Sequence, residues 1–179
     1  MSISLPDSEY EDETVIVSRE INLNGKNICK INGRLVTVSE LKQFMSKVIV
    51  ITGASRGIGR NMAYNLAING YQVIANYNAS EKQALELQEE LKAQGIEIDI
   101  FKANVSKSQE ARRLVNYAIE KYGRIDVLIN NAGIAQEKLF TDIEEEEFDK
   151  MIKTNLYSVF YTTQEAVRYM VRVHNGCII

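Results

Sequence analysis

A glycine-rich turn, TGASRGIG at residues 52–59, constrains the fold of this chain more than any other feature. It follows the apolar run 47–51 and precedes residues 58–68, whose apolar side chains recur at helical spacing. Glycines between a buried strand and a helix let the backbone turn sharply and let a pyrophosphate approach the helix N-terminus. The turn therefore predicts a dinucleotide-binding site, against the alternative of a tight turn that binds no ligand.

From residue 47 onward, strand-like and helical segments alternate. We expect strands at 47–51, 71–76, 96–101, 126–129 and 176–179, and helices at 58–68, 81–93, 106–122 and 145–172. Strands that alternate with helices of ten or more residues are typical of a parallel sheet with right-handed crossovers. The pattern predicts an α/β fold with a doubly wound parallel sheet of Rossmann type, in strand order 3-2-1-4-5. We expect the sheet to be incomplete at the C-terminus, where the chain stops in its fifth strand.

Residues 1–46 have a different character and form a predicted N-terminal extension. Two β-prone runs, 15–21 and 27–31, flank Asn24-Gly25, a dipeptide that favours a tight hairpin turn. Thr37-Val38-Ser39-Glu40 has the form of a capping box and predicts a short helix over 41–45. A β-hairpin and one short helix are too little to bury a core alone, so we place a domain boundary between residues 46 and 47.

Composition excludes several classes of protein. The 179 residues carry a net charge of −3, which argues against a nucleic-acid-binding protein. No apolar run has the roughly 18 residues of a membrane helix, and the first ten residues do not form a secretory signal, so we expect a cytoplasmic protein. Cys29 and Cys177 are far apart and are predicted to be reduced, buried thiols. With one histidine, His174, no metal site is expected.

Four motifs, in order, resemble those of the short-chain dehydrogenase/reductase family. These are the TGxxxGxG turn, Asn104-Val105 after the third strand, Asn130-Asn131-Ala132-Gly133 after the fourth, and Asn155 in the sequence KTNL. ITGASRGIGR and NYNAS most resemble the β-ketoacyl-acyl-carrier-protein reductases of that family. The resemblance covers residues 47–179 and implies reduction of a 3-oxoacyl group in fatty acid biosynthesis, by a homo-oligomer, without nucleic-acid or membrane partners.

The resemblance also implies the site residues. Asn155 matches the catalytic asparagine of the family. The implied cofactor-binding residues are Gly53, Ala54, Ser55, Arg56, Gly57, Ile58, Gly59, Asn76, Asn78, Asn104, Val105, Asn131, Ala132 and Gly133. No acid stands at 75–78 to repel a 2′-phosphate, and Arg56 supplies a cation, so NADP(H) is the expected cofactor. The alternative for Arg56 is a solvated surface charge.

The family's catalytic Ser, Tyr and Lys have no matching positions in this chain, so we expect it to be inactive by itself. Tyr117 and Lys121 have the YxxxK spacing but precede the NNAG motif on a helix that flanks the sheet, so we do not regard them as catalytic. The acidic run 144–147 is interpreted as a solvated helix start, and His174 as a helix-end residue.

Residues 18–37 resemble part of the head domain of the DNA-repair ATPase RecN, through SREI, NGK and INGRLVT. No phosphate-binding GxxxxGK[ST] loop precedes residue 46, so ATPase activity does not follow. Two alternatives to a reductase remain open: a non-catalytic nucleotide-binding module, and a fusion fragment related to this ATPase.

Overall fold

The computed structural model describes residues 17–21, 27–31, 33–37 and 46–179. Contacts divide the chain into two compact units, Met1–Met45 and Ser46–Ile179. Within the described residues, none of the helices is long and apolar enough to cross a membrane.

The first unit contains an antiparallel sheet of β1 (Val17–Ile21), β2 (Asn27–Ile31) and β3 (Arg34–Val36), in that order. The predicted antiparallel pairing of the first two strands is confirmed, since Val17 pairs with Ile31 and Ile21 with Asn27, whereas the predicted turn at Asn24-Gly25 lies outside the described residues. The third strand was not predicted. It pairs with β2 directly after a two-residue connection, since Ile31 lies opposite Arg34, and Gly33 in that connection has a φ of +78°. The predicted helix at 41–45 lies outside the described residues.

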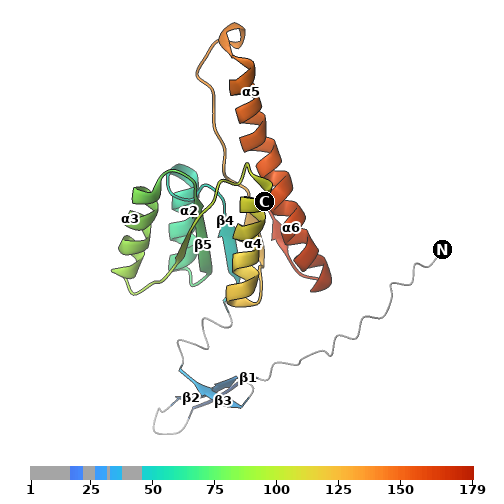
Figure 1. Cartoon of the computed structure of the whole chain (residues 1–179). Helices are drawn as coiled ribbons and strands as arrows, with labels where there is room; N and C mark the ends of the chain where they lie inside the picture. Colours follow the sequence, from blue (N-terminus) through green and yellow to red (C-terminus); the bar gives the residue numbers. More distant parts are fainter. Residues whose placement is uncertain (1–16, 22–26, 32, 38–45) are drawn as a thin grey trace, which may run out of the picture. The chain divides into compact units, whose positions relative to one another are not determined.

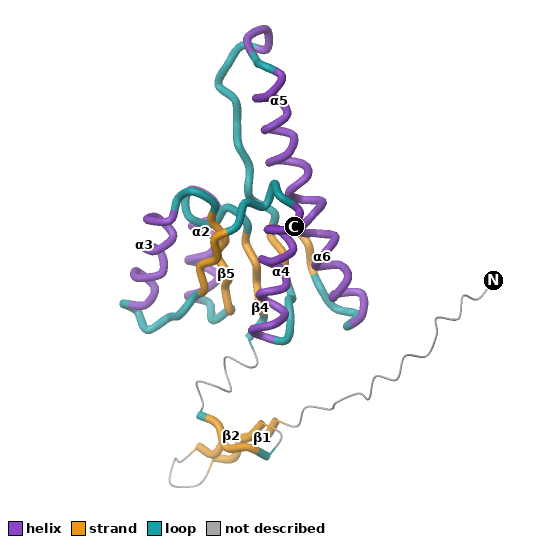
Figure 2. The backbone as a smooth tube through the Cα atoms, viewed as in Figure 1, coloured by secondary structure: helices purple, strands orange, loops and turns teal. Residues whose placement is uncertain are grey.

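The second unit has a parallel sheet of β4 (Val48–Ile51), β5 (Gln72–Tyr77), β6 (Asp99–Lys102), β7 (Val127–Ile129) and β8 (Cys177–Ile178). The strand order is β6-β5-β4-β7-β8, which confirms the predicted order 3-2-1-4-5. Figure 2 labels two neighbouring strands of this sheet, β4 and β5. All residues of β4 and β5 are buried, as expected for strands covered on both faces. The fold is therefore the predicted doubly wound sheet.

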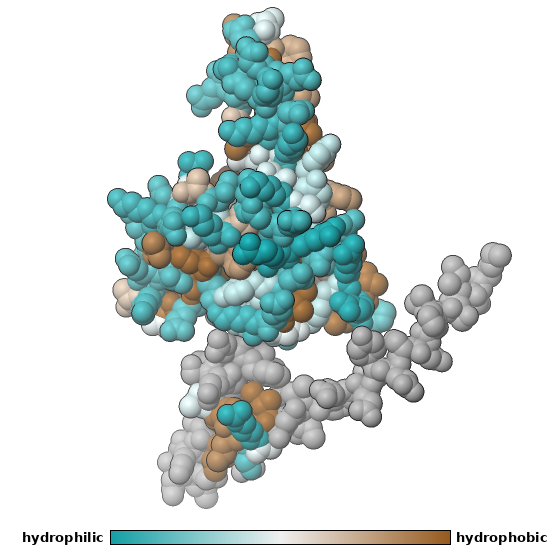
Figure 3. All heavy atoms as spheres, viewed as in Figure 1, coloured by the Kyte–Doolittle hydropathy of each residue, from teal (hydrophilic) through white to brown (hydrophobic). Residues whose placement is uncertain are grey.

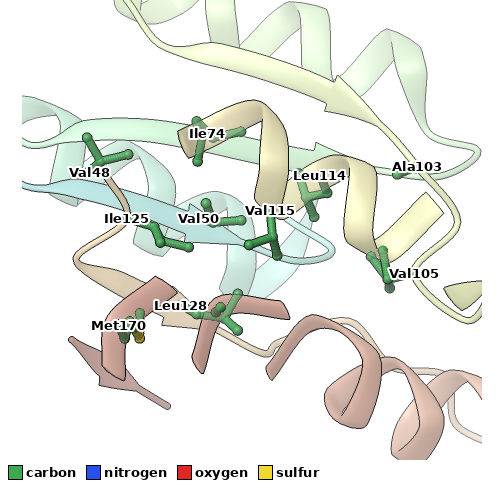
Figure 4. Close-up of a cluster of buried hydrophobic side chains, with 13 residues drawn as sticks. Val48, Val50, Ile74, Ala103, Val105, Leu114, Val115, Ile125, Leu128 and Met170 are labelled. Carbon is green, nitrogen blue, oxygen red and sulfur yellow. The ribbon is translucent and has the colours of Figure 1, made fainter. Parts of the chain in front are cut away.

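Helices cover both faces of this sheet (Figure 1). α2 (Gly57–Ile68) and α3 (Glu81–Lys92) bury Ala63, Ala67, Leu87 and Leu91 against one face. α4 (Ser108–Tyr122) and α6 (Ser158–Arg172) cover the other face. Their core combines strand, loop and helix side chains, including Val50, Ile74, Leu114, Val115, Leu128 and Met170 (Figure 4). The alternation of side chains along each strand thus supplies two separate cores.

The predicted helix over 145–172 has an interruption that its sequence did not reveal. α5 (Glu145–Ile152) leads into a π-helical segment, η2 (Lys153–Tyr157), which leads into α6. A 3-10 turn, η1 (Phe140–Asp142), precedes α5. As predicted, the acidic run opens a helix: Glu144 is the N-cap of α5 and forms a capping box with Glu147. The wide turn η2 contains Asn155 and is the part of this helix that concerns the site.

Candidate functional site

The glycine turn joins β4 to α2, and its glycines meet three different steric demands. Gly53 has a φ of +64°, and a Cβ there would lie 2.9 Å from the Ala132 backbone. A Cβ on Gly59 would lie 2.4 Å from Nδ2 of Asn131 and 2.5 Å from the Gly53 carbonyl oxygen. Gly57 has a φ of +57°, and a Cβ there would meet nothing within 4 Å. Two glycines thus pack against NNAG, and the third borders open space.

The N-terminus of α2 suits an anionic group. The N–H groups of Gly57, Ile58 and Gly59 donate to no group in the described part of the chain, and the first turn of the helix has no acid. Ile58 is 75% exposed, so solvent reaches this end of the helix. Arg56, the N-cap residue, is exposed and makes no ion pair among the described residues. The helix dipole and free N–H groups there favour a bound phosphate.

Asn76 supports the turn from inside the protein. Its side chain is 2% exposed. Its Oδ1 accepts the N–H of Gly53 at 3.2 Å, and its Nδ2 donates to the carbonyl oxygens of Phe101 (3.1 Å) and Ala103 (3.0 Å). The amide of Asn76 thus joins β5, β6 and the turn, and the cofactor contact predicted for Asn76 stays a prediction. Asn78, just beyond the end of β5, is exposed.

Thr52 links the turn to the NNAG segment, and sequence reasoning did not include it among the site residues. Its Oγ1 accepts the N–H groups of Asn131 and Ala132, both at 2.9 Å. Nδ2 of Asn131 donates in return to the carbonyl oxygens of Thr52 (2.9 Å) and Gly53 (3.0 Å). The signal was present, because Thr52 is the first residue of the TGxxxGxG motif. These four bonds hold the ends of β4 and β7 together.

Asn104 and Val105 follow β6. Oδ1 of Asn104 accepts the N–H of Ser106 at 3.1 Å and its hydroxyl at 2.7 Å, and the Asn104 N–H donates to the Glu110 carboxylate at 2.7 Å. That backbone hydrogen bond, followed by the bond to Lys107, lowers the pKa of Glu110. The side chain of Val105 is buried in the core below α4. Asn104 is therefore the residue of this pair whose side chain stays near the surface.

Asn155 holds the loop after NNAG to η2. Its Oδ1 accepts the N–H of Ile134, and its Nδ2 donates to the Ile134 carbonyl oxygen, both at 2.8 Å. A Cβ on Gly133 would lie 3.4 Å from Oδ1 of Asn155, so Gly133 allows this close approach. A cavity of about 250 Å³ lies beside it, lined by Ile134, Ala135, Gln136, Glu147, Lys150 and Met151. The Asn155 amide thus positions one wall of this cavity.

Tyr117 and Lys121 lie away from the glycine turn. Nζ of Lys121 contacts Oδ1 of Asp99 at 2.6 Å and the Tyr117 hydroxyl at 3.2 Å. Burial opposes the charge of Lys121, but these two bonds outweigh it and raise its pKa. Asp99 begins β6, whereas the glycine turn follows the carboxyl end of β4. The YxxxK pair lies on α4, which flanks the sheet as predicted, and it contacts the amino-terminal end of β6, whereas the glycine turn lies at the carboxyl ends of the strands.

The two cysteines and the histidine lie outside the candidate site. Cys29 is buried as predicted, but Cys177 is exposed, because it lies on the edge strand β8. His174 follows the end of α6, as predicted, and is exposed. Among the described residues, no group of three or more His, Cys, Asp or Glu side chains could hold a metal ion.

Comparison with known proteins matches the same part of the chain. The family model described as short chain dehydrogenase matches residues 47–179. The 3-oxoacyl-acyl-carrier-protein reductases of Staphylococcus epidermidis and Staphylococcus aureus are 42% identical over 135 residues, which is 75% of this chain and 55% of theirs. The chain therefore spans about half the length of these relatives. The match does not reach residues 1–46, so the resemblance of that segment to a DNA-repair ATPase stays a prediction.

A solved structure agrees with this match. A double mutant of a Serratia marcescens short-chain dehydrogenase/reductase superposes with a TM-score of 0.66 at 30% identity, covering 71% of this chain and 52% of that one. Three observations agree on one family: the strand order, the hydrogen bonds between the glycine turn and NNAG, and the match of the family model. Through residues 47–179, the chain belongs to the short-chain dehydrogenase family.

Proposed function

We propose that this chain is the cofactor-binding part of an NADP(H)-dependent reductase that acts on 3-oxoacyl groups carried by acyl-carrier protein. The observation that carries the proposal is the solvent-accessible N-terminus of α2, with its free N–H groups, no acid in its first turn, and Arg56 beside it. The names of the relatives, 3-oxoacyl-acyl-carrier-protein reductases, support this choice of substrate. We also propose that the protein works in the cytoplasm.

The residues around the turn fit a nicotinamide dinucleotide. The N–H groups of Gly57, Ile58 and Gly59 would hold its pyrophosphate, and the open space at Gly57 leaves room for it. Asn104 would border the adenine, and Ala132 and Gly133 would lie along the dinucleotide. When bound, the nicotinamide supplies a hydride to the substrate carbonyl. Asn155 would act as a positioning residue, because both polar atoms of its amide hold Ile134.

The preference for NADP(H) is proposed from charge. Enzymes that prefer NAD(H) commonly place an acid at the end of the second strand, where it accepts bonds from the ribose. Here Asn76 and Asn78 stand at that end, and the first acid beyond it, Glu81, is paired with Tyr77 and Lys102. The guanidinium of Arg56 is exposed and can form a paired contact with a 2′-phosphate.

Titration with NADPH and NADH tests this preference. Arg56→Ala should weaken NADPH binding by about 1.5–3 kcal/mol, the usual strength of a hydrogen bond to a charged group, and leave NADH binding unchanged. Arg168→Ala is the matched control, since Arg168 is also exposed but pairs with Glu165 on α6. Equal weakening of both cofactors by Arg56→Ala would refute the assignment.

We further propose that this chain binds NADPH without reducing a ketone. Reduction builds negative charge on the carbonyl oxygen, and the family stabilises it with a Tyr proton donor and a Lys. Tyr117 and Lys121 cannot fill these roles, because Lys121 binds Asp99 at the amino-terminal end of β6, away from the glycine turn at the carboxyl ends of the strands. NADPH oxidation with an acetoacetyl thioester, measured for this chain and for a version extended through the family's Ser and YxxxK motifs, tests this. Comparable turnover by both would contradict it.

An oligomer is proposed from the exposed apolar side chains along α5, η2 and α6. Four large apolar side chains of these helices are about half exposed or more: Phe148 (49%), Leu156 (58%), Phe160 (57%) and Val171 (63%). Figure 3 shows hydrophobic residues among hydrophilic ones along α5 and α6. Exposed apolar residues in such a stripe commonly form a protein interface. Sedimentation of the chain at several concentrations tests whether copies associate, and Phe160→Lys should then weaken the association.

A further inference from the structure

Asn-Gly dipeptides are the places where asparagine changes most readily into aspartate. The nitrogen of the following residue attacks the side-chain carbonyl carbon, and glycine hinders this attack least because it has no Cβ. The chain contains four such dipeptides. Both residues are described at two of them, Asn69-Gly70 and Asn175-Gly176. All four of these residues are exposed, so differences between the two sites must come from hydrogen bonding and backbone conformation.

Asn69-Gly70 is held in a form that resists the reaction. The N–H of Gly70, which contains the attacking nitrogen, donates to the Ala67 carbonyl oxygen at 3.0 Å. Nδ2 of Asn69, the leaving group, donates to the Asn65 carbonyl oxygen at 2.7 Å. Both bonds belong to the C-terminal end of α2. Ring closure at this site must break them both, which adds to the barrier.

Asn175-Gly176 has no comparable restraint. The N–H of Gly176 donates to no group in the described part of the chain. Nδ2 of Asn175 has one long contact, 3.4 Å to Oδ1 of Asp126. The segment lies between the end of α6 and β8, outside regular structure. Only one long contact restrains the leaving amide, and no hydrogen bond among the described residues holds the Gly176 N–H, so the nitrogen can approach Cγ of Asn175.

We propose that Asn175 is a site of spontaneous deamidation in this protein. The Gly176 nitrogen loses its proton and bonds to Cγ of Asn175, the Cγ–Nδ2 bond breaks, and ammonia leaves a five-membered succinimide. Solvent water then opens the ring at either carbonyl carbon, which gives aspartate or isoaspartate. The reaction needs no oxidant, cofactor or enzyme, and in either product residue 175 gains one negative charge.

The new charge lies beside Asp126, a buried residue that connects β4 to the segment before β7. Asp126 is 5% exposed, and its Oδ2 accepts the Val48 N–H at 2.8 Å where β4 begins. A carboxylate at Asn175 faces Asp126 in place of an amide donor, so like charges meet. Isoaspartate also adds one methylene to the main chain just before Cys177, whose N–H donates to the Asp126 carbonyl oxygen at 2.9 Å. Deamidation should therefore loosen the pairing of β8 with β7.

Peptide mapping tests the proposal within one molecule. The full chain is incubated at mildly alkaline pH, with and without urea, and its tryptic peptides 61–82 and 173–179 are followed by mass spectrometry. In the folded chain, Asn175 should convert about tenfold or more faster than Asn69, the ratio expected from two hydrogen bonds of ordinary strength. In urea the two rates should converge, because the dipeptides are the same.

Two variants complete the test. Asn175→Gln should abolish the mass change in peptide 173–179, and Asn175→Asp should lower the melting temperature at pH 7 relative to the unmodified chain. Equal rates at Asn69 and Asn175 in the folded chain would overturn the proposal. So would conversion of Asn175 in urea with none in the folded chain.

Discussion

Replacing Thr52 by valine would test whether its hydroxyl joins the glycine turn to NNAG. Valine has nearly the same shape but has no acceptor for the N–H groups of Asn131 and Ala132, which both lie 2.9 Å from Oγ1. Thr52 is 2% exposed, so water does not easily replace the lost acceptor. An unsatisfied donor costs about 1–3 kcal/mol. Since the two N–H groups are only partly buried, we expect Thr52→Val to lower the free energy of unfolding by about 2–4 kcal/mol.

Thr52→Ser is the matched control, because it keeps the hydroxyl and loses only a buried methyl, at a cost of about 1 kcal/mol. Urea unfolding followed by circular dichroism gives both free energies, and the slope of each transition should stay that of the unmodified chain. NADPH titration of the same variants should show weaker binding for Thr52→Val than for Thr52→Ser. If the two variants were equally stable, the hydroxyl would not contribute as the structure implies.

Three further substitutions have outcomes that follow from the structure. Gly59→Ala places a Cβ 2.4 Å from Nδ2 of Asn131, so it should destabilise the fold by about 1–3 kcal/mol and weaken NADPH binding, whereas a neutral effect in urea unfolding would contradict the contact. The pKa of Glu110 is lowered in the folded protein, so its contribution to stability is present above its ordinary pKa and is lost as the pH falls through the folded value. Glu110→Gln should therefore melt at a lower temperature at pH 7 and converge with the unmodified chain in acid; a difference that stays constant with pH would exclude this role. His174 has a φ of +49°, so His174→Gly should raise stability by about 1 kcal/mol in thermal unfolding, and no increase would mean that other contacts offset the strain.

The fold of the second unit was predictable because its sequence pattern is strong and local. β4 is a continuous apolar run, the structure buries every residue of β4 and β5, and helices of a dozen or more residues separate successive strands. Two features were too weak to predict. β3 has three residues, too few for an alternating pattern to show. The wide turn η2 shifts the helical hydrogen bonds by one residue, which leaves no mark on apolar spacing.

The candidate site was predictable only in part, for a different reason. Glycines such as Gly53 and Gly59 show in the sequence because steric demands exclude other residues there. The role of a polar side chain depends on partners far along the chain. Thr52 bonds to residues 79 and 80 positions away, and Asn76 to the Ala103 carbonyl oxygen 27 positions away. A motif places such a residue near the cofactor but does not say whether it contacts the cofactor or supports the loop.

The three asparagines at Asn76, Asn131 and Asn155 show why the site uses amides for this support. The backbone leaves its regular pairing at the carboxyl ends of parallel strands, and a side-chain amide can replace a missing peptide partner because it both donates and accepts. Asn155 uses both groups on Ile134, and Asn131 donates to two carbonyl oxygens. An aspartate at Asn131 would place a carboxylate against those oxygens and could not donate. These amides form hydrogen bonds with the backbone groups of the surrounding loops. The N–H groups of residues 57–59 are left without a partner at the turn, and an anionic ligand can accept hydrogen bonds from them.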